Sequence, residues 1–230
     1  MTKHLDRDLE SLEQDLLSQS AMVEEMIRIA CRGLYERLPD VSQELQARES
    51  RINQREVHIE EECLKVLALH QPVAVDLRRV TTVLKVNGDL ERIADLAVNI
   101  GERNEVLIDF PHMPLPDFLE SMAETAIHMV RDSLDAFVDS DYELARRVCL
   151  RDDEVDAFNR RVIERVSDTV KNNPDLFDPA LHLFSASRHI ERIADHATNI
   201  AEDVMYLVEG EITRHGALFT TDEPEGSKDY

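Results

Sequence analysis

Apolar residues recur at intervals of three and four positions along most of this chain, which is the spacing of one face of an α-helix. In the first such stretch, about residues 5–37, they include Leu5, Leu9, Leu12, Leu16, Val23 and Met26. Five further stretches with the same spacing follow at about 41–69, 73–109, 117–138, 141–171 and 178–209. The pattern therefore predicts an all-α protein built from six long amphipathic helices.

Helix-breaking residues separate these stretches. The breaks lie at Pro39-Asp40, His70-Gln71-Pro72, Asn172-Asn173-Pro174 and Gly210. Ser140 and Glu143 have the spacing of a capping box at the start of the fifth helix. Asp178-Pro179 has the form of an N-cap followed by proline at the first helical position. These signals set the predicted ends of the helices.

One connection is unusually rich in proline and divides the chain. Residues 110–116 hold three prolines in seven positions, a density that no helix tolerates. We therefore expect a first three-helix bundle over residues 1–110, a link at 111–116 and a second three-helix bundle over 117–215. The polar tail at 216–230 is expected to be disordered. A single six-helix bundle is the alternative, but it explains the link less well.

A repeated motif supports two related halves. Glu91-Arg92-Ile93-Ala94-Asp95 returns unchanged as Glu191-Arg192-Ile193-Ala194-Asp195, shifted by 100 positions. Nine of the twelve positions from 91 to 102 are identical to their partners in the second copy. Because the motif falls in the third predicted helix of each half, the chain reads as two tandem three-helix bundles related by internal duplication.

The repeated helix places acidic residues on one face. Ile93, Ala97 and Ile100 form an apolar stripe, while a second line carries acids and an amide. That second line consists of Glu91, Asp95, Asn99 and Glu102, and its copy of Glu191, Asp195, Asn199 and Glu202. The second helix of each half adds a further pair at the same i, i+4 spacing: Glu49 with Asn53, and Asp152 with Asp156. Antiparallel packing could bring both pairs of a half into one patch.

Two interpretations of these acidic pairs stay open. Unpaired carboxylates at i and i+4 repel each other, and a hard cation such as Mg²⁺, Ca²⁺, Mn²⁺ or iron would reverse that repulsion. Alternatively, each line is a solvated face on which Arg92 pairs with Asp95 and Arg192 with Asp195. A carboxylate di-iron enzyme is disfavoured, because Ala94 and Ala194 stand where its Glu-x-x-His motif needs histidine.

Composition narrows the function classes further. Acids outnumber bases 48 to 26, for a formal net charge of −22, which disfavours direct binding to nucleic acid. Cys31, Cys63 and Cys149 are odd in number and far apart, as expected in a reducing compartment. No signal peptide or membrane span is evident, so we expect a cytoplasmic protein without membrane insertion. No nucleophile motif or phosphate loop is present, so we expect no catalytic or cofactor-binding residues.

The residues also resemble those of a known family. The doubled Glu-Arg-Ile-Ala-Asp followed by Ala-x-Asn-Ile, with Gln71-Pro72 and Asp76-Leu77-Arg78 before the first copy, is similar to the PhoU family of phosphate-signalling regulators. The resemblance implies two tandem three-helix bundles with pseudo-twofold symmetry, commonly dimeric. It also implies a cytoplasmic negative regulator of phosphate uptake and of the phosphate-starvation response. Such a protein would be an adaptor between a phosphate ABC transporter and a sensor histidine kinase, not an enzyme.

The resemblance also implies a metal site. The family motif is (Glu/Asp)-x-x-x-Asp, and some members carry multinuclear iron or zinc clusters on it. The matching positions are Glu49, Asn53, Glu91, Asp95, Asp152, Asp156, Glu191 and Asp195. Asn53 departs from the motif, because an amide is a weaker, neutral ligand. A metal-dependent enzyme, an accessory protein of a different phosphate carrier, and a structural helical protein are the alternatives.

Overall fold

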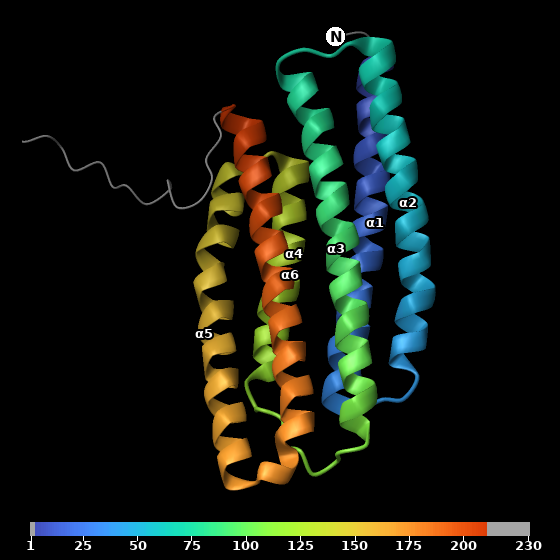
Figure 1. Cartoon of the computed structure of the whole chain (residues 1–230). Coiled ribbons are helices and arrows are strands. Elements are labelled where there is room, and N and C mark those ends of the chain that lie inside the picture. Colours follow the sequence, from blue (N-terminus) through green and yellow to red (C-terminus); the bar gives the residue numbers. More distant parts are fainter. Residues whose placement is uncertain (1–2, 211–230) are drawn as a thin grey trace, which may run out of the picture.

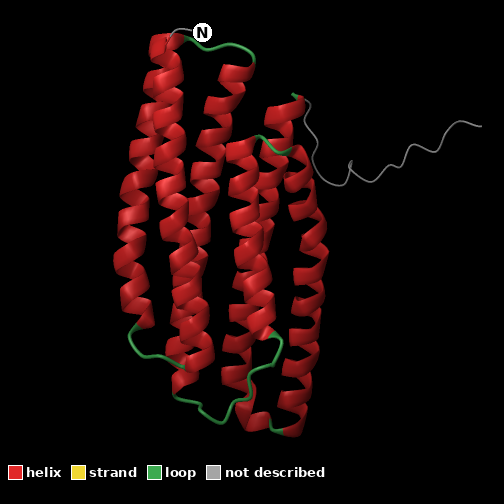
Figure 2. Cartoon of the chain, turned by 180° about the vertical axis from the view of Figure 1, so that it is seen from behind, coloured by secondary structure: helices red, strands yellow, loops and turns green. Residues whose placement is uncertain are grey.

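The computed structural model describes residues 3–210, and over that range it contains six long α-helices joined by loops (Figures 1 and 2). The helices are α1 (Lys3–Glu36), α2 (Val41–His70), α3 (Val75–Ile108), α4 (Leu119–Asp139), α5 (Tyr142–Asn172) and α6 (Phe177–Glu209). A short 3-10 turn, η1 (Pro174–Leu176), precedes α6. The all-α prediction is confirmed, and each helix begins and ends within two residues of its predicted position.

The helices form two three-helix bundles, α1–α3 and α4–α6, that lie side by side (Figure 1). In the view of Figure 1, α2 and α5 are the outer helices, α3 and α6 adjoin in the middle, and α1 and α4 lie behind them. Among the described helices, α3 and α6 make the most extensive pairing, and α1 also contacts α4. The two halves therefore share one continuous body.

The repeated motif lies where the two halves meet. Helices α3 and α6 run in opposite directions (Figure 1), and Asp89 on α3 contacts His196 on α6. This register brings residues 91–95 next to residues 191–195. The apolar side of both motif copies is completely buried, as the zero exposure of Ile93 and Ile193 shows. The motif is thus the centre of the joint between the halves, which we call the α3/α6 seam.

The turn between α4 and α5 differs from the prediction. Asp141, not Ser140, caps α5, because its Oδ1 accepts a hydrogen bond of 2.9 Å from the amide of Leu144. Ser140 instead ends α4 in the left-handed region, with φ of 50°. The predicted capping box of Ser140 with Glu143 is therefore wrong. The connection between the helices is so short that Ser140 must reverse the chain, which leaves the N-cap position to the next residue.

The two ends of α6 give one correction and one confirmation. Helix α6 begins at Phe177, directly after η1, so Asp178 is not its N-cap and Pro179 is its third residue. Proline is tolerated there because the first turn of a helix lacks intrahelical partners for its amides. Gly210 ends α6 as predicted, with φ of 78° and its amide donating to the Tyr206 carbonyl at 2.9 Å.

The proline-rich connection is held against the first half. The Arg37 guanidinium donates to the carbonyl oxygens of Leu107, of Phe110 at 3.0 Å and of Met113 at 2.6 Å. The Met113 side chain is itself buried. Hydrogen bonds to a charged donor are among the stronger ones in proteins, so Arg37 fixes the path of the chain between α3 and α4.

Two further predictions concern the end of the chain and membrane spans. The expected disordered tail at 216–230, and the second half beyond residue 210, lie outside the described residues. Within residues 3–210, none of the helices has the length and apolarity needed to cross a membrane.

Candidate functional site

The first acidic cluster joins α2 to α3. Glu49 on α2 shares a side-chain hydrogen bond with Asp95 on α3. Burial, that hydrogen bond and the negative charges of Asp95 and Glu91 together raise the pKa of Glu49 to about 7. Burial, followed by the charge of Asp95, also raises the pKa of Glu91. Near neutral pH a substantial fraction of Glu49 is therefore protonated, and in that form its carboxyl can donate a hydrogen bond to Asp95.

The second acidic cluster joins α5 to α6 in the equivalent place. Burial raises the pKa of Asp152 to about 6, helped by the negative charges of Asp195, Asp156 and Glu191. Burial is also the main cause that raises the pKa of Glu191 and of Asp195. The structure thus brings the four predicted acids of the second half into mutual electrostatic contact, from two different helices.

The arginines of the motif do not neutralise these clusters. The ion pairs expected between Arg92 and Asp95, and between Arg192 and Asp195, do not form. Across residues 3–210, Arg92 and Arg192 are exposed and make no hydrogen bond or ion pair. Arg188 takes this place in the second half and binds Glu191 at 2.5 Å. The solvated-face interpretation in its predicted form is therefore wrong, because neither of the two predicted ion pairs forms.

The geometry only partly resembles a preformed metal site. Asn53 is exposed and has no hydrogen bond in the described part of the chain. Within residues 3–210 no group of three or more His, Cys, Asp or Glu side chains is arranged closely enough to hold a metal ion. However, Glu191 Oε2 is buried without a hydrogen-bond partner. Its chemistry, with the surrounding carboxylates, fits a hard cation. The eight-residue metal assignment stays a prediction.

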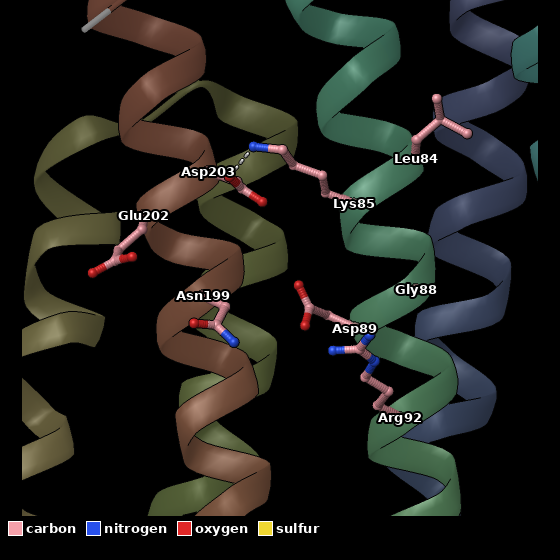
Figure 3. A pocket seen from close by; sticks show the side chains of 8 residues that line it. All are labelled: Leu84, Lys85, Gly88, Asp89, Arg92, Asn199, Glu202 and Asp203. Atoms are coloured by element: carbon pink, nitrogen blue, oxygen red, sulfur yellow. Dashed lines mark hydrogen bonds and ion pairs between the residues drawn. The ribbon is translucent and has the colours of Figure 1, made fainter. Parts of the chain in front are cut away.

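A polar cavity of about 440 Å³ lies at the α3/α6 seam (Figure 3). Lys85, Asp89 and Arg92 line it from α3 and point toward α6, which supplies Asn199, Glu202 and Asp203. Lys85 Nζ binds Asp203 Oδ1 at 2.6 Å, and next to the cavity Asp89 Oδ1 lies 2.8 Å from His196 Nδ1. These two contacts tie the halves together across the seam.

Sequence reasoning missed this cavity, because several of the residues that connect the two halves there differ between the two copies. Asp89 corresponds to His189, and His196 corresponds to Leu96. Residues that match between the copies do not reveal Asp89 and His196. An acid at position 89 and a histidine at position 196, each without a match in the other copy, could have indicated a contact between the halves.

The cysteines lack the properties of catalytic nucleophiles. Burial raises the pKa of the Cys31, Cys63 and Cys149 thiols to about 12. A thiol with so high a pKa carries almost no thiolate near neutral pH, and the thiolate is the reactive form.

The fold and the site together define a class of all-α proteins: duplicated three-helix bundles with paired acidic faces. The PhoU domain model matches this chain twice, at residues 16–103 and 119–204, so the chain belongs to the PhoU family. The resemblance noted in the sequence is thereby confirmed.

Curated relatives match over most of both chains. A phosphate-specific transport system accessory protein PhoU homolog of Synechocystis is 35% identical, over 90% of this chain and 92% of its own length. The homologs of Pseudomonas putida and Aquifex aeolicus are 34% and 36% identical, over 95% and 91% of this chain and 86% and 95% of their own. All three bear the same description, so the family assignment does not depend on one relative.

Solved structures match equally well. The crystal structure of PhoU from Pseudomonas aeruginosa has a TM-score of 0.86 at 33% identity, over 90% of this chain and 99% of its own. That of the phosphate transport system regulatory protein PhoU from Streptococcus pneumoniae has a TM-score of 0.86 at 26% identity, over 92% and 100%. The duplicated bundle is thus the fold of both solved PhoU proteins.

Proposed function

We propose that this protein is an accessory regulator of phosphate-specific transport that acts as an adaptor in the cytoplasm. In this role it binds a phosphate ABC transporter and a sensor histidine kinase, and it keeps the phosphate-starvation response off when phosphate is plentiful. The observation that carries the proposal is the double PhoU domain match, together with relatives described as phosphate-specific transport system accessory proteins.

The structure supports coupling more than chemistry. The described residues include two long bundles joined at one seam, and their buried thiols lack nucleophilic character. An adaptor transmits a signal only if it binds the two states of its partner with different affinity. A transporter state that alters its contacts with this protein would then shift the kinase between its active and inactive forms.

We further propose that the acidic clusters hold a divalent cation, or an iron or zinc cluster. In the first half Glu49, Glu91 and Asp95 would be ligands, with Asn53 as the weakest candidate. In the second half the ligands would be Asp152, Asp156, Glu191 and Asp195. The raised pKa of Glu49, caused by burial and by the neighbouring Asp95, supports this assignment, because a cation would stabilise the charged form of Glu49 beside Asp95. Bound metal would tie α2 to α3 and α5 to α6.

A binding experiment tests the adaptor role directly. The full chain is immobilised and presented separately with the cytoplasmic portion of the kinase and with the transporter's ATPase subunit from the same organism. Saturable binding to both partners is expected, and it should persist at moderate salt concentration. Binding to neither, with the protein shown to be folded by circular dichroism, would contradict the adaptor role.

We also propose that the protein is a homodimer, as the family resemblance implies. Light scattering on the purified full chain is expected to give twice the monomer mass of 26.4 kDa. A monomer at micromolar concentration would contradict this part of the proposal without affecting the adaptor role.

A further inference from the structure

The internal repeat relates the cavity of Figure 3 to a second surface farther along the seam. A shift of 100 positions converts the residues that line the cavity into a second set on the same two helices. The polar and charged members of that set are Ser185, Arg188, His189 and Arg192 on α6, with Asn99, Glu102 and Arg103 on α3. We call this second set the basic seam cluster. The helices α3 and α6 run in opposite directions (Figure 1). A twofold rotation about an axis through the middle of the seam therefore places the cavity residues of one helix on the corresponding residues of the other.

The charge of the two sites is opposite. The cavity is lined by two cations, Lys85 and Arg92, and by three carboxylates. The basic seam cluster carries three arginines and one carboxylate. The changes that reverse the sign are Gly88 to Arg188, Asp89 to His189 and Asp203 to Arg103. In a chain with a formal net charge of −22, three clustered arginines are a marked local exception.

The contacts within the cluster confirm that its members are neighbours. Ser185 Oγ lies 3.3 Å from His189 Nε2, within one turn of α6. The positive charges of Arg103, Arg192 and Arg188 all act on the His189 ring, as does the negative charge of Glu102, so these residues of both helices lie near it. The residues that the repeat predicts to be together are therefore together in the structure.

The cluster has hydrogen-bonding capacity that the described protein does not use. Arg103 Nη2 donates to Glu102 Oε2 at 3.0 Å, but Arg103 Nε and His189 Nδ1 are both buried without a hydrogen-bond partner. Arg192 is exposed and makes no hydrogen bond or ion pair within residues 3–210. Buried polar atoms without partners are rare in proteins, and a bound ion or water is a common explanation.

We propose that the basic seam cluster binds a small oxyanion of the size and charge of inorganic phosphate. Arg103, Arg188 and Arg192 supply the positive charge, and Ser185 supplies a hydroxyl donor. A planar guanidinium can donate two parallel hydrogen bonds to one oxyanion, which suits phosphate better than a point charge does. Arg188 and Arg192 are one helical turn apart and Arg103 faces them from α3. The donors thus surround one small group and do not form a stripe for an acidic peptide.

This site is separate from the proposed metal ligands, although Arg188 connects the two. Its guanidinium binds Glu191 at 2.5 Å, so an oxyanion in the cluster would compete with that carboxylate for Arg188. The proposal rests on the repeat, on the charge reversal and on the unused donors. It does not depend on the adaptor role, which could fail while phosphate still binds.

Calorimetric titration with inorganic phosphate tests the site in the metal-stripped full chain at low ionic strength. The variants Arg192→Gln and Arg103→Gln remove a charged donor each and are expected to weaken phosphate affinity about tenfold or more. Arg92→Gln is the matched control, because Arg92 is the repeat partner of Arg192 and is likewise exposed without a hydrogen bond or ion pair in the described chain. It should leave phosphate affinity unchanged. Circular dichroism verifies that each variant keeps its helical content.

Several results would overturn the proposal. One is a wild-type protein that binds no phosphate at millimolar concentration, and another is an equal loss of affinity in Arg92→Gln. Phosphate binding that appears only after metal is restored, and that Glu191→Gln abolishes, would assign phosphate to the metal ligands. Binding of ATP or of an acidic peptide without binding of inorganic phosphate would show that the cluster recognises a larger partner.

Discussion

Replacing Glu49 with glutamine should stabilise the metal-free protein, although it alters a proposed ligand. The pKa of Glu49 is raised from its ordinary value of 4.5 to about 7, so the folded state disfavours its charged form. The free-energy cost of ionisation is fully present above pH 7, shrinks as pH falls through 7, and vanishes below about pH 4.5. Glu49→Gln removes the charge and keeps a group able to donate to Asp95.

The magnitude follows from the size of that shift. A rise in the pKa from 4.5 to about 7 corresponds to about 3 kcal/mol as an upper bound. Glu49 is partly open to solvent, which screens the interaction, so the expected gain at pH 8 is about 1–2 kcal/mol. Most of the gain should disappear by pH 5, where Glu49 of the folded wild type is already protonated.

Urea unfolding of metal-stripped protein at pH 8 and pH 5 measures this difference. Glu105→Gln, at an exposed position on the same helix as Asp95, is the control and should change the free energy of unfolding little at either pH. A Glu49→Gln protein that is less stable than the wild type at pH 8, or equally stabilised at both pH values, would refute the reasoning. If a cation binds the cluster, added metal should stabilise the wild type more than the variant.

Four further predictions concern packing and thiol reactivity. Gly101→Ala should lower the free energy of unfolding by about 1–3 kcal/mol, because its Cβ would lie 2.8 Å from Leu45 Cδ1. Gly88→Ala, with no atom within 4 Å of the added Cβ, should raise it by up to about 1 kcal/mol through helix propensity, and urea titration compares the two. Ile93→Ala removes a completely buried side chain at the seam and should cost about 2–5 kcal/mol in the same assay. Cys63, with its pKa raised to about 12 by burial, should react with a thiol reagent at pH 8 only when the protein unfolds.

The helices could be predicted from sequence because their causes are local. The three- and four-residue spacing of Leu5, Leu9 and Leu12 depends only on the geometry of one helix, and so does the line from Glu91 to Asp95. Gly210 was found for the same reason, since a helix that ends in the left-handed region favours glycine. The Asp141 cap was not found, because the choice between Ser140 and Asp141 depends on how two antiparallel helices are connected.

The candidate site was predictable only in part. Helical spacing places Asp152 near Asp156 and Glu191 near Asp195, but only packing shows that α5 and α6 bring the two pairs together. The ion pair that the spacing predicts between Arg92 and Asp95 does not form, which spacing alone cannot show. The contact of Asp89 with His196 requires knowledge that α3 and α6 adjoin in antiparallel register. Asp89 and His196 differ from their repeat partners, so the identical positions of the repeat give no indication of their contact.

The central proposal, that this protein holds the phosphate-starvation response off, is tested most directly in cells that lack this gene. A reporter of the phosphate-starvation response is measured in the deletion strain, grown with ample phosphate, with and without the wild-type gene restored. The account predicts that the reporter is on in the deletion strain and off again after complementation. A reporter that stays off in the deletion strain would contradict the proposal that this protein holds the response off when phosphate is plentiful.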